Sequence, residues 1–136
     1  EFRRVLFRSF EVMHHLKDQI RTTNEKQPSS EKSIRLKKVL SFIQENFSRN
    51  ISVEEAAALT NLSTSRFMKP FKQQTGMPFI QYVNDYRLEL AAEELVQSQK
   101  RVTQIAFENG FENLSYFISL FRRKFSLSPT EYRKSR

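Results

Sequence analysis

The chain of 136 residues contains no cysteine, no tryptophan and only two glycines. Without cysteine, neither a disulfide framework nor a thiolate metal site can form. No apolar run approaches the roughly 18 residues that a membrane-spanning helix needs. This composition fits a reducing, cytoplasmic setting and disfavours a membrane protein.

Residues suited to catalysis or metal binding are also scarce. The only histidines, His14 and His15, are adjacent, so on a helix their side chains would diverge rather than share a metal ion. The acid pairs Glu54-Glu55 and Glu93-Glu94 suit solvent-facing and capping positions, and there is no Gly-rich phosphate loop. We therefore expect neither an enzyme nor a bound cofactor or metal.

Basic and aromatic residues are abundant. The net charge of +8 and the isoelectric point near 10.0 favour a polyanionic partner. Two segments hold basic residues without any acid, namely 64–76 and 114–125. Thirteen phenylalanines and four tyrosines supply the apolar surface for a small core.

The chain repeats one pattern, in which two helices are joined by a tight turn. The first copy spans about 52–76 and the second about 102–125. The repeat is too short to form a solenoid. Two basic helix-turn-helix copies instead suggest two DNA-reading elements on one duplex. The matching positions are Val53 and Val102, Ala56 and Ile105, Ala57 and Ala106, Leu62 and Phe111, Phe67 and Phe117, Phe71 and Phe121, Lys72 and Arg122, and Tyr82 and Tyr132.

Helical spacing of apolar residues predicts an all-α domain over residues 31–136. We expect seven helices arranged as two homeodomain-like helix-turn-helix subdomains joined by a long central helix over 79–98. Ser52 with Glu55, and Ser128 with Glu131, are predicted capping boxes. The first helix is predicted from an apolar stripe formed by Ile34, Leu36, Val39, Leu40, Phe42, Ile43 and Phe47.

Residues 1–30 are predicted to lie outside the domain. Residues 1–9 resemble a translated sequencing adapter and are expected to be an artefact. Residues 10–20 have helical spacing, as the tail of an upstream helix would. Residues 22–30 are polar, include Pro28, and are expected to be a linker.

The motifs of the repeat resemble the DNA-binding domain of AraC-type transcription regulators over about 34–133. The resemblance implies two helix-turn-helix units tied by a rigid central helix, with one recognition helix from each unit in successive major grooves. It also implies regulation of transcription initiation, including activation, with RNA polymerase as a partner and dimerisation through a separate upstream domain. The motif residues are Ala57, Leu62, Ser63, Phe67, Phe71, Lys72, Thr75, Gly76, Tyr82, Arg87, Leu88, Ala91, Ile105, Ala106, Gly110, Phe111, Ser115, Tyr116, Phe117, Phe121, Ser128, Pro129, Tyr132 and Arg133.

Phenylalanines at i and i+4 in each second helix are expected to face the core, which leaves the opposite face for DNA. Cations on that face would neutralise phosphates, including Lys124 beside Arg122 and Arg123. In the first unit the predicted DNA-binding residues are Ser63, Thr64, Ser65, Arg66, Met68, Lys69 and Lys72. In the second they are Asn113, Leu114, Ser115, Ile118, Ser119, Arg122 and Arg123. By the resemblance, base readout falls on Ser65, Met68, Lys69, Leu114, Ser115, Ile118 and Ser119. Partial core packing is the alternative for Met68 and Ile118.

Three residues depart from the AraC-type pattern. Ser119 stands where arginine is common, so one DNA contact is expected to be missing. Ser126 stands where glycine is usual, and a left-handed conformation there would cost about 1 kcal/mol. Pro70 lies inside the predicted recognition helix, where it removes one helical hydrogen bond at a cost of roughly 3 kcal/mol.

Two alternatives to DNA binding follow from the same residues. A protein-docking module would use its helices on a partner such as RNA polymerase, with DNA binding lost through Pro70 and Ser119. A basic membrane-surface binder is disfavoured, because the aromatic residues are expected to face a core rather than one continuous side. A salt-dependent shift of labelled DNA separates the first alternative from a DNA-binding domain.

Overall fold

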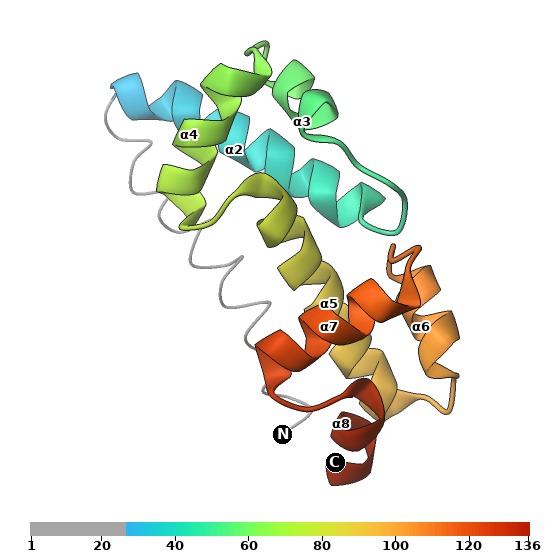
Figure 1. The fold of residues 1–136 in the computed structure, drawn as a ribbon. Helices are drawn as coiled ribbons and strands as arrows, with labels where there is room; N and C mark the ends of the chain where they lie inside the picture. Colours follow the sequence, from blue (N-terminus) through green and yellow to red (C-terminus); the bar gives the residue numbers. More distant parts are fainter. Residues whose placement is uncertain (1–26) are drawn as a thin grey trace.

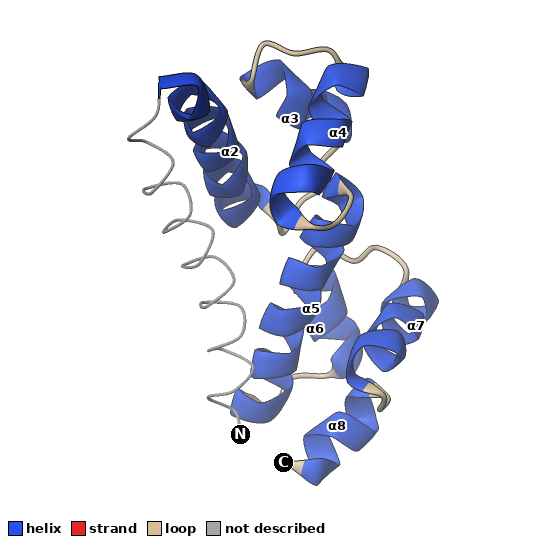
Figure 2. Ribbon diagram, turned by 90° about the vertical axis from the view of Figure 1, so that its left-hand side faces the viewer, coloured by secondary structure: helices blue, strands red, loops and turns tan. Residues whose placement is uncertain are grey.

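The computed structural model describes residues 27–136, which form helices and connecting loops without a strand (Figures 1 and 2). The predicted all-α class is confirmed for this part of the chain. The expectations for residues 1–26, including His14 and His15, lie outside the described residues. The helices are α2 (Gln27–Asn46), α3 (Val53–Leu59), α4 (Thr64–Thr75), α5 (Phe79–Gln97), α6 (Val102–Glu108), α7 (Leu114–Phe125) and α8 (Pro129–Ser135).

Two separate cores divide the molecule, and α5 contributes to both. We call α2, α3, α4 and the start of α5 the first unit, and the rest of α5 with α6, α7 and α8 the second unit. Figure 1 shows α5 running between them. Phe79, Tyr82 and Val83 of α5 belong to the first core. Leu88, Ala91, Ala92 and Leu95 belong to the second core.

The phenylalanines of each repeat pack inward, as their spacing predicts. Phe67 and Phe71 of α4 lie with ring centroids 5.5 Å apart, and Phe71 meets Tyr82 edge to face at 5.5 Å. The second unit copies this arrangement, with Phe117 and Phe121 at 5.7 Å and Phe121 against Tyr132 at 5.3 Å. Tilted and edge-to-face aromatic pairs of this kind contribute about 0.5–1.5 kcal/mol each beyond the area they bury.

Local capping residues set where the helices begin. The predicted capping box of α3 is confirmed, since Ser52 N donates to Glu55 Oε2 at 2.9 Å and Glu55 N donates to Ser52 Oγ at 3.2 Å. The Ser52 amide, and to a lesser extent Arg49, lower the pKa of Glu55 from its ordinary value. At α8, Glu131 N donates to Ser128 Oγ, but the Glu131 carboxylate pairs with Arg122 instead of returning to Ser128.

The beginning of the first helix differs from the sequence-based expectation. α2 begins at Gln27, so Pro28 lies in its first turn rather than in a linker. Proline fits there, because the first amides of a helix have no intrahelical partner. Ile34 was expected in the buried stripe, yet it is 52% exposed. It lies two residues from buried Leu36, which places it on the opposite side of the helix.

The two glycines have different surroundings. Both adopt a left-handed conformation, Gly76 with φ of 85° and Gly110 with φ of 93°. A Cβ at Gly76 would meet nothing within 4 Å, whereas a Cβ at Gly110 would overlap the Phe47 carbonyl oxygen and lie 2.7 Å from Arg87 Nε. The turn of the second unit therefore approaches the end of α2 closely.

Gly110→Ala is expected to lower the free energy of unfolding by about 3 kcal/mol, from left-handed strain plus overpacking. Gly76→Ala is the matched control, since it adds the strain alone and should cost about 1 kcal/mol. Urea unfolding of both variants measures the difference. Equal losses at the two positions would show that the contact with α2 does not constrain Gly110.

Candidate nucleic-acid interface

The outward face of α4 carries three exposed cations, Arg66, Lys69 and Lys72. Within residues 31–136, no ion pair joins any of them to a carboxylate. Met68 is 50% exposed on the same helix, so the structure favours a surface position over core packing for this residue. The face is therefore positive, with one apolar side chain among the cations.

Three small polar residues open α4. Ser63 is the N-cap, and its Oγ accepts a hydrogen bond from Arg66 N at 3.4 Å. Ser63 Oγ also lies 3.4 Å from the Oγ of Ser65, which is exposed, while Thr64 is half-buried. The positive end of the helix is thus exposed beside two hydroxyls, as at helix N-termini that contact phosphate.

α7 presents the corresponding face in the second unit. Asn113 caps it by accepting from Tyr116 N at 2.9 Å. Leu114 is 37% exposed, and Ser115 and Ser119 are exposed next to it. Ile118 is partly buried against the second core, which is the partial core packing given as its alternative.

The cations of α7 differ in how free they are. Arg123 is exposed and makes no ion pair within residues 31–136. Arg122 lies 3.7 Å from Glu131 with both side chains largely exposed. A surface pair of this kind is worth about 0–1 kcal/mol, so a phosphate can replace the carboxylate.

Lys124 does not join this surface, contrary to the sequence-based expectation. Its amino group lies 3.6 Å from Asp85 and 3.5 Å from Glu89, both on α5, and its side chain is only 21% exposed. The expectation rested on the absence of acids within segment 114–125, whereas the acids that neutralise Lys124 come from another helix. The second unit therefore exposes two cations, Arg122 and Arg123, where three were expected.

Tyr116 was not among the predicted site residues, although it lies on the same helix. It is exposed, and its hydroxyl accepts a hydrogen bond from Asn84 Nδ2 of α5 at 3.2 Å. The family motif contains this tyrosine, but no local pattern in the sequence pairs it with Asn84. The hydrogen bond ties the first turn of α7 to the central helix.

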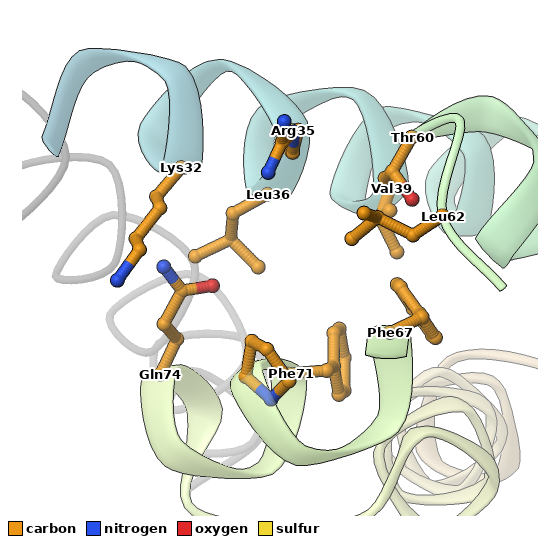
Figure 3. A pocket seen from close by; sticks show the side chains of 10 residues that line it. Lys32, Arg35, Leu36, Val39, Thr60, Leu62, Phe67, Phe71 and Gln74 are labelled. Atoms are coloured by element: carbon orange, nitrogen blue, oxygen red, sulfur yellow. The ribbon is translucent and has the colours of Figure 1, made fainter. Parts of the chain in front are cut away.

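Two of the residues that depart from the AraC-type pattern, Ser126 and Pro70, lie within the described structure at the end of α7 and inside α4. Ser126 has φ of 64°, the left-handed conformation expected where glycine is usual. α4 runs from Thr64 to Thr75 with Pro70 inside it. Pro70 lines a small pocket between α2 and α4, in which Leu36 and Val39 face Phe67 and Phe71 (Figure 3).

Two helix pairs, each with a side-chain-capped second helix that exposes a basic face, define a double helix-turn-helix domain of the DNA-binding class. The profile of a helix-turn-helix domain family matches residues 56–135. The chain belongs to the AraC-type helix-turn-helix family.

Known relatives agree with this assignment. The chain is 39% identical to the transcriptional activator RhaS of Klebsiella pneumoniae over an alignment of 102 residues. This alignment covers 75% of this chain and 37% of RhaS. An AraC-type regulator from Chromobacterium violaceum is 27% identical with a TM-score of 0.69, covering 76% of this chain and 92% of that one. The DNA-binding domain of AdpA, solved with a target DNA, is 28% identical with a TM-score of 0.70. The match covers 74% of this chain and 90% of the AdpA chain. The chain thus spans little more than a third of the curated relative RhaS.

In the part of the chain from residue 27 onward, no group of three or more histidine or acidic residues could hold a metal ion. None of the helices described is long and apolar enough to cross a membrane.

Pro70→Leu is expected to raise the free energy of unfolding by ~2–3 kcal/mol. Leucine would restore the amide that the Arg66 carbonyl lacks and add apolar contact in the pocket of Figure 3. The reciprocal change Leu120→Pro, at the equivalent position of α7, should destabilise by about 3 kcal/mol. Urea unfolding of both variants measures these changes in the free energy of unfolding. A neutral or destabilising Pro70→Leu would mean that α4 has adapted to the proline.

Proposed function

We propose that this domain binds specific double-stranded DNA sequences and regulates transcription initiation, with α4 and α7 as recognition helices in successive major grooves. The observation that carries the proposal is the pair of exposed faces. Each combines exposed cations with small polar and apolar side chains on a helix that fits a major groove.

The residues divide into two roles by position and chemistry. Lys69 can donate to guanine O6 and N7, Ser65 can donate or accept, and Met68 can contact a thymine methyl group. Leu114, Ser115, Ile118 and Ser119 are the corresponding base-facing candidates on α7. The phosphate-facing candidates are Arg66, Lys72, Arg122 and Arg123, together with the caps Ser63, Thr64 and Asn113.

The relatives support the wider role. RhaS is named as a transcriptional activator, and the AdpA domain was solved with a target DNA. By this similarity the protein would act in the cytoplasm, where bacterial DNA is read, with RNA polymerase as a partner. Dimerisation through a region outside residues 31–136 belongs to the same proposal.

A nuclease-protection footprint on a duplex selected from a random library tests the proposal. We expect protection of two adjacent major grooves on one face of the duplex by a single monomer, about 34 Å apart. The monomeric state is checked by light scattering of the complex. Protection of one groove only would mean that one unit reads DNA and the other does not.

DNA binding is expected to weaken steeply with salt. With about five phosphates neutralised, the logarithm of the association constant should fall with a slope near −4 to −5 against the logarithm of salt concentration. Fluorescence anisotropy of labelled duplex at several salt concentrations measures it. Lys124→Ala is the control that should leave the slope unchanged, because Asp85 and Glu89 already hold that amino group. A flat response would favour a protein-docking module instead.

Lys69→Ala is expected to change sequence preference, whereas Arg123→Ala should weaken all sequences about equally. Lys69 lies in the first half of α4, where base edges are within reach, and Arg123 lies near the end of α7, closer to the backbone. The base contact should contribute ~1–3 kcal/mol of discrimination. Titrations of the selected and a scrambled duplex compare the two variants. Equal losses on both duplexes for Lys69→Ala would refute its role in base readout.

A further inference from the structure

One buried guanidinium lies where the two units meet. Arg87 of α5 is only 9% exposed. Its Nε donates to the Phe47 carbonyl oxygen at 2.7 Å, and its Nη2 donates to the Arg49 carbonyl oxygen at 2.8 Å. Both carbonyls follow the end of α2, so Arg87 binds the first unit at the point where α2 stops.

The same guanidinium also contacts the second unit. Its Cζ lies 5.9 Å from the centre of the Phe111 ring, in the turn between α6 and α7. Beside it, Gly110 approaches the Phe47 carbonyl so closely that no Cβ fits. Burial lowers the pKa of Arg87 from its ordinary value, while Glu112 and Tyr116 act in the opposite direction.

A hydrogen-bonded path continues from Arg87 to the second recognition helix. Arg87 Nη1 donates to Asn84 Oδ1 at 3.3 Å, and Asn84 Nδ2 donates to the Tyr116 hydroxyl at 3.2 Å. Tyr116 lies in the first turn of α7, next to Ser115. At the other end of the path, Arg49 Nη1 donates to Oε1 of Glu55, a residue of the α3 capping box, at 3.1 Å. Polar contacts therefore connect the start of α3 with the start of α7.

Few other contacts hold the units together. α5 packs against helices of both units, whereas no helix of the first unit packs extensively against α6, α7 or α8. The single helix α5 could bend or twist between the units unless a second connection braced it. The Arg87 contacts provide that connection, because they join the end of α2 to α5 and α7.

We infer that Arg87 is a positioning residue that fixes α4 and α7 relative to one another, and so sets the half-site spacing that the domain accepts on DNA. Its role in spacing rests on the proposed DNA-binding function, whereas its role in orientation does not. A fixed orientation keeps the second recognition helix at high effective concentration once the first is bound. It also excludes half-sites at the wrong spacing, since each inserted base pair turns one half-site by roughly a tenth of a turn.

The main variant is Arg87→Lys, which keeps the charge but loses the planar fork that reaches two carbonyls and Asn84 at once. Arg133→Lys is its matched control. Arg133 Nε donates to the Leu95 carbonyl oxygen at 2.9 Å, and Nη2 donates to the Lys100 carbonyl oxygen. These contacts resemble those of Arg87 but stay within the second unit, so their loss should affect stability without affecting the orientation of the units.

Orientation is measured without DNA. Spin labels are attached to two introduced cysteines at exposed positions, Gln73→Cys on α4 and Ser119→Cys on α7. The chain has no cysteine of its own, so the labels react nowhere else. We expect a narrow distance distribution by pulsed electron resonance in the parent and in Arg133→Lys, and a clearly broader one in Arg87→Lys. An equally narrow distribution in Arg87→Lys would overturn the inference, whatever the DNA results.

Spacing is measured on the selected duplex, on versions with one base pair inserted or removed between half-sites, and on a single half-site. These titrations use chains without the labels. Arg87→Lys should bind the selected duplex about tenfold or more weakly, discriminate less among spacings, and bind the single half-site within about threefold of the parent. Equal losses on single and double sites would overturn the role in spacing. If the parent binds no DNA, the proposed function fails, and the distance measurement alone decides the role in orientation.

A second variant covers the case in which Arg87→Lys does not fold. Tyr116→Phe removes only the hydroxyl at the far end of the path, from an exposed residue, and leaves the guanidinium with its two carbonyls. It should broaden the distance distribution in the same direction but less. A distribution identical to that of the parent would then overturn the inference.

Discussion

The inward packing of two phenylalanines on each of α4 and α7 is the constraint from which the rest of the structure follows. Phe67 packs edge to face against Phe79, and Phe71 packs in the same way against Phe79 and Tyr82. In the second unit, Phe121 packs edge to face against Tyr132. Once these rings are buried, helical geometry leaves only the opposite face of α4 and α7 for solvent. The cations and small polar residues of α4 and α7 are exposed to a partner because the buried phenylalanines occupy the other side of each helix.

Features encoded locally could be predicted from the sequence. The Ser52–Glu55 box and the caps at Ser63 and Asn113 each depend on residues a few positions apart. The spacing of phenylalanines within one helix likewise determines which side is buried. The family resemblance added the left-handed conformation at Ser126, where glycine is usual. The DNA contacts of individual residues stay a prediction.

Features that depend on distant residues could not be predicted. Lys124 is neutralised by Asp85 and Glu89 of another helix, so a count of charges within its own segment misassigned it. The carbonyl partners of Arg87 lie 38 and 40 residues away in the sequence. Ile34 shows a related limit, because an apolar residue near a stripe is not always on the buried side.

The double use of α5 means that the boundary between the units is a whole helix and not a point in the chain. Its 19 residues close the first core at one end and open the second core at the other. A cut anywhere within α5 would expose apolar surface on both fragments. Dividing this domain into two separately folded halves would therefore require a copy of α5 in each, and a chimera that exchanges one unit must match the donor to the face of α5 that it covers.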